Sequence, residues 1–254
     1  MMYAPRLYNV CRTLSDYCRF VINSQMLISL TFDKFGNYFV QSLLKVADDT
    51  SYGLFIDCFV KDASTFARLA THAYGSHVVQ LAIVLAGERK SASLKLVDCI
   101  CKNVAYLSSD YLGAICLESA ITLLPTSSKL LSVIAPLTSQ LSTSRHGHMV
   151  VICALRNACS QTLGVMETEF AKHLESLVGN GYGFRVVIFA LDMEKSGKIN
   201  PKYSRVRLFI QNLKFSFHFF KLINHIILNF PSHPVVVNDL IPSIVRIVNQ
   251  EKIS

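Results

Sequence analysis

The chain has 254 residues and a formal net charge of +8, and 51% of its residues are hydrophobic. This share of apolar residues predicts extensive burial in a sizeable core. No run of 18 or more apolar residues is free of charge, so we expect no membrane-spanning helix. The first residues, Met1 to Arg6, also lack the apolar core of a signal peptide.

The first clear element in chain order is an apolar run that opens at Gly36, in the segment Phe35-Gly-Asn-Tyr-Phe-Val-Gln41. A related segment, Tyr74-Gly-Ser-His-Val-Val-Gln80, places its glycine 39 residues later. The same pattern recurs in weaker form, so that the anchors are Gly36, Gly75, Gly113, Gly147 and Gly183. A sixth unit near Phe217 has lost its glycine. Repeats with a period of roughly 20 to 50 residues indicate a solenoid, in which each unit buries its apolar face against its neighbours.

Each run has the spacing of an amphipathic helix. In the first, Val40, Leu43 and Leu44 share one face, whereas Asn37 and Gln41 share another because they are four residues apart. Such a pair presents two hydrogen-bonding groups about 5 to 6 Å apart, which suits the edge of one nucleobase.

Ser76 and Gln80 form the equivalent pair in the second unit. The residue after Asn37 or Ser76 is Tyr38 or His77, whose flat ring is suited to stacking on a base. Polar residues on a solvated helix face are the alternative reading of any one pair. Two pairs in the same register, each with a ring at the middle position, favour RNA recognition.

The segments at 35 to 41 and 74 to 80 resemble the second helix of Pumilio (PUF) repeats. This resemblance implies an all-α, right-handed α-solenoid of about six three-helix repeats, each repeat reading one base of single-stranded RNA. We expect a single domain over residues 1–254. Residues 1–18 would form an N-terminal cap or partial repeat, 19–230 the repeats, and 231–254 a C-terminal cap.

The family's recognition code then implies which bases are read. Asn37 with Gln41 would read uracil with Tyr38 stacking, and Ser76 with Gln80 would read adenine with His77 stacking. Because PUF proteins bind RNA antiparallel to the order of their repeats, the implied dinucleotide is 5′-AU-3′.

The later units depart from the code. Glu118 resembles a guanine reader, but Ala114 replaces its usual serine partner. The last two units have isoleucine at the last reading position, which offers no hydrogen bond to a base edge. His148 and Arg185 are retained as predicted RNA contacts, and an arginine there suits stacking or a phosphate. We expect the aromatic residues of the weaker units to pack in the core instead: Tyr111, Phe184 and Phe219.

The remaining signals concern charge and cysteines. From Lys195 to Ser254 the chain has nine lysines and arginines against two acidic residues, a basic excess that suits either polyanion binding or a solvated loop. The eight cysteines show no CxxC spacing, which indicates buried thiols in a reducing compartment. We therefore expect a cytoplasmic protein, with the nucleus or nucleolus as the alternative.

Enzymatic readings are weak. The segment Gly179-Asn-Gly-Tyr-Gly183 has Phe184 where a dinucleotide-binding loop needs its third glycine, and no strand precedes it. His146 and His148 lack the further ligands that a metal site needs. We expect no enzyme activity, no metal and no cofactor.

Two functions remain open. The first is a monomeric binder of single-stranded RNA, in the 3′ UTR of messages, that controls translation or decay together with protein co-regulators on its convex face. The alternative is a helical-repeat scaffold that binds protein or structured RNA, such as a nucleolar factor for ribosome biogenesis.

Overall fold

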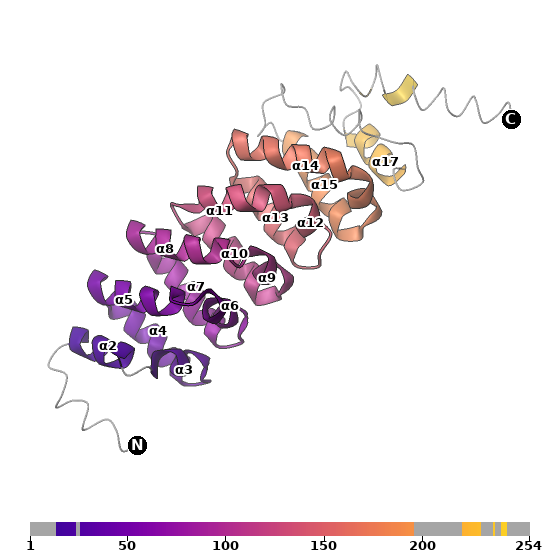
Figure 1. The fold of residues 1–254 in the computed structure, drawn as a ribbon. Helices are drawn as coiled ribbons and strands as arrows, with labels where there is room; N and C mark the ends of the chain where they lie inside the picture. Colours follow the sequence, from indigo (N-terminus) through magenta and orange to yellow (C-terminus); the bar gives the residue numbers. More distant parts are fainter. Residues whose placement is uncertain (1–13, 24–25, 196–219, 230–235, 237–239, 243–254) are drawn as a thin grey trace. The chain divides into compact units, whose positions relative to one another are not determined.

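The computed structural model describes residues 14–23, 26–195, 220–229, 236 and 240–242. Every regular element that it describes is helical (Figure 1), which confirms the prediction of an all-α fold. The chain divides into two compact units, residues 1–134 (unit 1) and 135–254 (unit 2). The predicted caps fall largely outside the described residues, and α2 (Leu14–Asn23) runs across the predicted boundary at residue 18.

Unit 1 consists of three-helix repeats. After α2 come α3 (Met26–Phe32), α4 (Gly36–Val46), α5 (Asp49–Val60), α6 (Ala63–Thr71), α7 (Gly75–Ala86), α8 (Lys90–Cys101), α9 (Val104–Ser109), α10 (Tyr111–Leu123) and α11 (Ser127–Ile134). Helices α2, α5, α8 and α11 contact one another in succession and form the first row; α4, α7 and α10 do the same and form the third row. Helices α3, α6 and α9 each pack on the third-row helix that follows. Each repeat therefore contributes one helix to the third row.

Unit 2 continues the pattern with modifications. It contains η1 (Ala135–Leu137), α12 (Thr138–Ser142), α13 (Gly147–Asn157), α14 (Ser160–Gly179), α15 (Gly181–Lys195) and α17 (Phe220–Asn229). Helix α14 is two helices joined at a kink, where His173 has φ −117° and ψ 17°. It therefore replaces the first two helices of a repeat, and α13 and α15, which pack together, correspond to the third row.

The signature glycines have a steric cause that is common to both units. A Cβ atom on any of them would lie 2.3 to 2.8 Å from the carbonyl oxygen of the leucine six residues earlier. The pairs are Gly36 and Leu30, Gly75 and Leu69, Gly113 and Leu107, Gly147 and Leu141, and Gly183 and Leu177. Since real Cβ atoms do not approach backbone this closely, only glycine lets the third helix of a repeat pack directly on the end of the second.

A second local feature sets the start of these helices. The residue three positions before each glycine accepts a hydrogen bond from the glycine N–H, and it satisfies one of the donors that a helix leaves unpaired at its N-terminus. The acceptors are Asp33, His72, Asp110, Ser144 and Asn180, at distances of 2.6 to 3.3 Å. Leucine, acceptor and glycine thus form one repeated unit that positions each third helix.

The core of unit 1 is rich in aromatic side chains. Tyr52, Phe55, Phe59 and Phe66 are fully buried. The Tyr52 hydroxyl donates a hydrogen bond to the Ala82 carbonyl oxygen and so links α5 to α7. Burial raises the pKa of Tyr52, and its hydroxyl therefore stays protonated.

Ion pairs on the surface of unit 1 join neighbouring repeats. They connect the first-row helices or the residues that cap them: Arg89–Asp49, Lys95–Asp57 and Lys129–Asp98. All three are solvent-exposed, so each contributes little to stability.

Some side chains lie elsewhere than the sequence predicts. Tyr111 is 56% exposed, and the prediction that it packs in the core is wrong. As the first residue of α10 it precedes the apolar face, whereas Gly113 and Ala114 are buried. Phe184 is half-buried, and Phe219 lies outside the described residues.

Two sequence predictions concern the burial of the cysteines and the absence of a membrane-spanning helix. Cys18, Cys99 and Cys116 are buried free thiols as expected, while Cys159 is exposed. No single helix in the described ranges is long and apolar enough to cross a membrane; α6 and α7 reach that length only together, across a 108° bend.

Candidate nucleic-acid interface

The predicted pair on α4 is brought together in the structure. Gln41 Nε2 donates a hydrogen bond of 3.0 Å to Asn37 Oδ1. The Asn37 amide nitrogen in turn donates to the carbonyl oxygens of Asp33 (3.0 Å) and Lys34 (2.8 Å). Asn37 is buried and held from both sides, whereas Gln41 is half-buried. The Gln41 amide is therefore oriented before any ligand arrives.

Two aromatic side chains stand out from the same turn of α4. Tyr38 is 67% exposed and Phe35 is 74% exposed. Lys34 Nζ lies 5.5 Å from the centroid of the Phe35 ring. Exposed rings beside a cation are suited to stacking on the bases of a single strand. Tyr38 thus occupies the position that a stacking residue needs.

The second predicted pair lies on α7, which packs against α4. Ser76 is 1% exposed, and its Oγ is a buried polar atom without a hydrogen-bond partner in the structure. Burying an unpaired hydroxyl typically costs about 1 to 3 kcal/mol. His77 is exposed and Gln80 is half-buried, so both are accessible. The Ser76 hydroxyl is therefore a hydrogen-bonding group that the described residues leave without a partner.

The third helix of the row, α10, carries a less complete set. Ala114 is buried, while Ile115 and Glu118 are half-buried. Gln41, Gln80 and Glu118 each lie five residues after a signature glycine, on three helices in successive contact. The polar side chains therefore follow one register along the third row of unit 1.

In unit 2 the two predicted RNA contacts, His148 and Arg185, lie in different environments. His148 is 8% exposed, and its ring lies 5.0 Å from that of Tyr182 with 31° between the planes. Its Nδ1 lies 3.3 Å from the Ser144 carbonyl oxygen. The exposed residue at the middle position is Met149 instead, and on α15 it is Arg185. His148 makes its contacts within the protein, whereas Arg185 faces solvent.

Comparison with known proteins fits this geometry. A family model described as "Pumilio-family RNA binding repeat" matches residues 27–51 and 66–88, which include both polar pairs. Pumilio homolog 9 of Arabidopsis thaliana is 24% identical over 197 residues, covering 76% of this chain and 34% of that protein. Putative pumilio homolog 8, chloroplastic, of the same plant is 24% identical over 225 residues, covering 85% and 42%.

Solved structures share the fold. The PUM-HD domain of S. pombe Puf1, in complex with RNA, matches with a TM-score of 0.73 and 18% identity over 92% of this chain and 63% of that one. A Puf4 mutant bound to a Cox17 RNA 3′ UTR recognition sequence matches with a TM-score of 0.72 and 16% identity over 89% and 76%. The chain contains Pumilio repeats at residues 27–51 and 66–88.

This Pumilio-repeat protein spans less than half the length of the curated relatives it matches. The matched family segments cover α3 with α4 and α6 with α7, where the leucine, acceptor and glycine are all followed by a polar pair. Gly113, Gly147 and Gly183 keep the packing glycine without such a pair. The later repeats therefore share the packing glycine of the matched segments but not their polar pair.

Sequence reasoning missed one candidate contact of the Pumilio-repeat protein. The guanidinium carbon of Arg156 lies 4.9 Å from the centroid of the Phe189 ring. Arg156 is nine residues after Gly147, two turns beyond the middle position of the motif. Its only sequence signal is that four-residue spacing from Ile152 places it on the same helical face.

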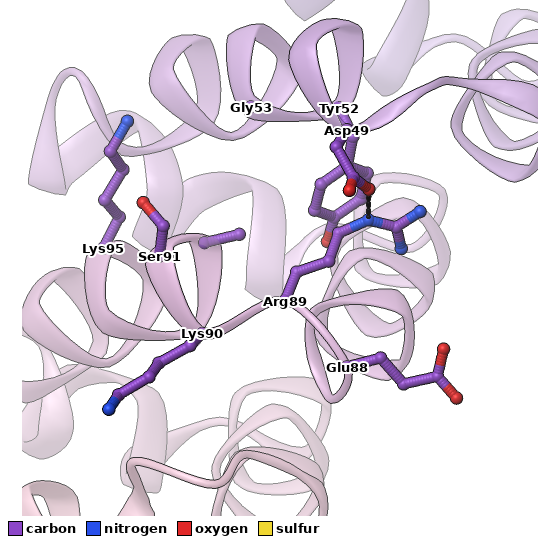
Figure 2. A pocket seen from close by; sticks show the side chains of 9 residues that line it. Asp49, Tyr52, Gly53, Glu88, Arg89, Lys90, Ser91 and Lys95 are labelled. Carbon is purple, nitrogen blue, oxygen red and sulfur yellow. Dashed lines mark hydrogen bonds and ion pairs between the residues drawn. The ribbon is translucent and has the colours of Figure 1, made fainter.

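A polar cavity of about 250 Å³ lies between α5 and the start of α8 (Figure 2). Arg89 Nε donates to Asp49 Oδ1 at 2.7 Å, and the Arg89 guanidinium lies 4.5 Å from the centroid of the Tyr52 ring. Because Arg89 pairs with Asp49 and stacks on Tyr52, these residues connect two neighbouring repeats on the first row. We therefore assign the residues that line the cavity a structural role. The described residues hold no cluster of three or more metal-ligating side chains, and His146 and His148 gain no third ligand.

Proposed function

We propose that this Pumilio-repeat protein binds single-stranded RNA along the third row of unit 1 and reads two adjacent bases there. The observation that carries the proposal is the matched pair of motifs on α4 and α7. Each has a buried polar residue, an exposed ring and a half-buried glutamine in the same order, and the two helices pack together.

The chemistry of each position suits a base. Tyr38 and His77 are exposed rings on neighbouring helices, and stacking on an aromatic side chain contributes about 1 to 3 kcal/mol per base. Gln41 and Gln80 offer donors and acceptors for the base edge. By the family code, the α4 pair takes uracil and the α7 pair takes adenine on its 5′ side, giving 5′-AU-3′.

At the cellular level, we place the protein among factors that bind the 3′ UTR of messages and control translation or decay. Structures with the same fold include Puf4 and Puf3 domains bound to 3′ UTR recognition sequences. We expect a non-catalytic, cytoplasmic, monomeric protein that acts through protein co-regulators.

One observation favours a second function, a scaffold for protein or structured RNA. In unit 2 the reading positions hold Met149, Ile152 and Ile188, of which Met149 is 41% exposed. Apolar side chains at these positions offer no hydrogen bonds to a base edge. A scaffold would bind through this apolar surface, and its binding would be indifferent to the α4 pair.

RNA selection from a random pool separates the two functions. The wild type should enrich a single-stranded motif that contains AU, and Gln41→Ala should relax the uracil position at a cost of about 1 to 3 kcal/mol. The matched control is Gln161→Ala, an exposed glutamine on α14. Enrichment of no motif, or the same motif from Gln41→Ala, would reject base reading and leave the scaffold.

A further inference from the structure

Helices α13 and α15 carry apolar residues where α4 and α7 carry the glutamines of the polar pairs. Their residues five positions after the glycine are Ile152 and Ile188, which have no hydrogen-bonding side chain. The same helical faces carry two exposed arginines. Arg156 lies four residues after Ile152, and Arg185 lies three residues before Ile188. Each arginine therefore lies about one helical turn from the isoleucine at the last reading position of its helix.

One of these cations stacks on an aromatic ring of the neighbouring helix. Arg156 on α13 stacks over Phe189 on α15, with 4.9 Å between the guanidinium carbon and the ring centroid. Arg185 and Phe189 are four residues apart on α15, so their Cβ atoms are about 5 to 6 Å apart on one face. Because α13 and α15 pack against each other, both guanidinium groups belong to one surface.

Among the described residues, no carboxylate forms an ion pair with Arg156 or Arg185. Three exposed lysines differ in this respect, since Lys95, Lys129 and Lys172 each pair with a carboxylate. A guanidinium that is already stacked on a ring loses less freedom on binding, and its N–H edge matches the oxygens of a phosphate.

We propose that Arg156 and Arg185 bind phosphate groups of the RNA backbone, and that unit 2 adds affinity without reading sequence. This rests on the proposed function, because unit 1 supplies the base preference. The arginines would hold nucleotides outside the AU dinucleotide. Phosphate contacts position a strand but carry no base information, so the surface tolerates any sequence.

The test is the salt dependence of binding to two short labelled RNAs, one with AU and one scrambled, measured by fluorescence anisotropy. For single strands, the slope of log K against log salt is about −0.7 for each phosphate contact, so Arg156→Ala/Arg185→Ala should make the slope less negative by about 1.4. Between 50 and 200 mM salt, the wild type should then lose about sevenfold more affinity than the double variant. The ratio of affinities for the two RNAs should stay unchanged.

Lys129→Ala/Lys172→Ala is the matched control, because it removes the same charge from exposed lysines that are already ion-paired. Its slope should stay close to that of the wild type. An unchanged slope in the arginine variant would overturn the backbone contact while leaving base reading by unit 1 intact. A loss of AU preference along with affinity would also overturn it, because the arginines would then contribute to base preference. A wild type that binds neither RNA would reject the proposed function itself, and the backbone contact with it. Thermal melts of both double variants check that each is folded.

Discussion

The side-chain amide of Gln41 donates a hydrogen bond of 3.0 Å to the side-chain oxygen of Asn37, and Asn37 is itself held by two backbone carbonyl groups of the preceding turn. A buried amide thus orients a more accessible one. Since the side chains are ordered before binding, less rotamer entropy is lost when a base arrives. Base preference at this position should therefore depend on the pair rather than on Gln41 alone.

Exchanging the pair should change the base. Glutamate with a serine partner resembles the family's guanine reader, so Asn37→Ser/Gln41→Glu should move the preference of the α4 position from uracil to guanine. Competition binding with four RNAs that differ only at this base measures the change. An unfolded variant could not gain guanine binding, so such a gain would show that the pair reads the base. A preference for uracil that persists in the variant would show that these residues do not read the base.

Replacing Ser76 should separate stability from binding. Its buried Oγ has no hydrogen-bond partner, and alanine favours the helix more than serine does. We expect Ser76→Ala to keep or raise the melting temperature while lowering affinity for AU-containing RNA by about 1 to 3 kcal/mol. Ser142→Ala, whose parent hydroxyl already donates to the Thr138 carbonyl oxygen at 2.6 Å, should leave RNA affinity unchanged. Equal losses of affinity in the two variants would contradict a role for Ser76 at the base.

Alanine at a signature glycine should be poorly tolerated. At Gly113 the new Cβ would lie 2.3 Å from the Leu107 carbonyl oxygen and 2.8 Å from its Cα, so α9 and α10 must separate. We expect a loss of about 1 to 3 kcal/mol in the free energy of unfolding, measured by urea denaturation. The control is Gly164→Ala on α14, where a Cβ would meet no atom within 4 Å beyond the adjacent backbone of its own helix; it should be neutral or stabilising by about 0.5 to 1 kcal/mol. Similar values for both variants would show that backbone contact is not what selects glycine.

Acid should weaken the capped turns of unit 1. Hydrogen bonds from the backbone N–H groups of Gly36 and Phe35 lower the pKa of Asp33, and the Ser64 and Thr65 hydroxyl groups lower that of Asp62. A carboxyl group whose pKa is lower in the folded state contributes stability above its unfolded pKa of about 4, and this contribution is lost as the pH falls through the folded value. The melting temperature should therefore decrease as the pH is lowered below about 4.

Asp33→Asn/Asp62→Asn tests the source of that acid sensitivity. Asparagine keeps a side-chain acceptor at both positions but does not titrate, so this variant should melt with a flatter dependence on pH between 5 and 2.5. Circular dichroism at several pH values measures the difference. A curve as steep as that of the wild type would place the sensitivity elsewhere in the protein.

The repeat, its helices and the two polar pairs were predictable from the order of the amino acids. Spacings of four residues on one helix decide which side chains share a face, so Asn37 with Gln41 and Ser76 with Gln80 could be paired from the sequence alone. The glycines were visible as anchors for a similar reason, since they recur at a fixed place before each apolar run.

The roles of the side chains in the weaker units depend on how the helices pack. His148 meets Tyr182 and Arg156 meets Phe189 across gaps of more than 30 residues, and neither contact follows from the helical period. Tyr111 is exposed because the chain enters α10 before the buried face begins. The reason for each glycine also needed the structure, because the leucine carbonyl oxygen that excludes a side chain belongs to the end of another helix. Local periodicity is written in the sequence, whereas contacts between helices depend on how the repeats pack.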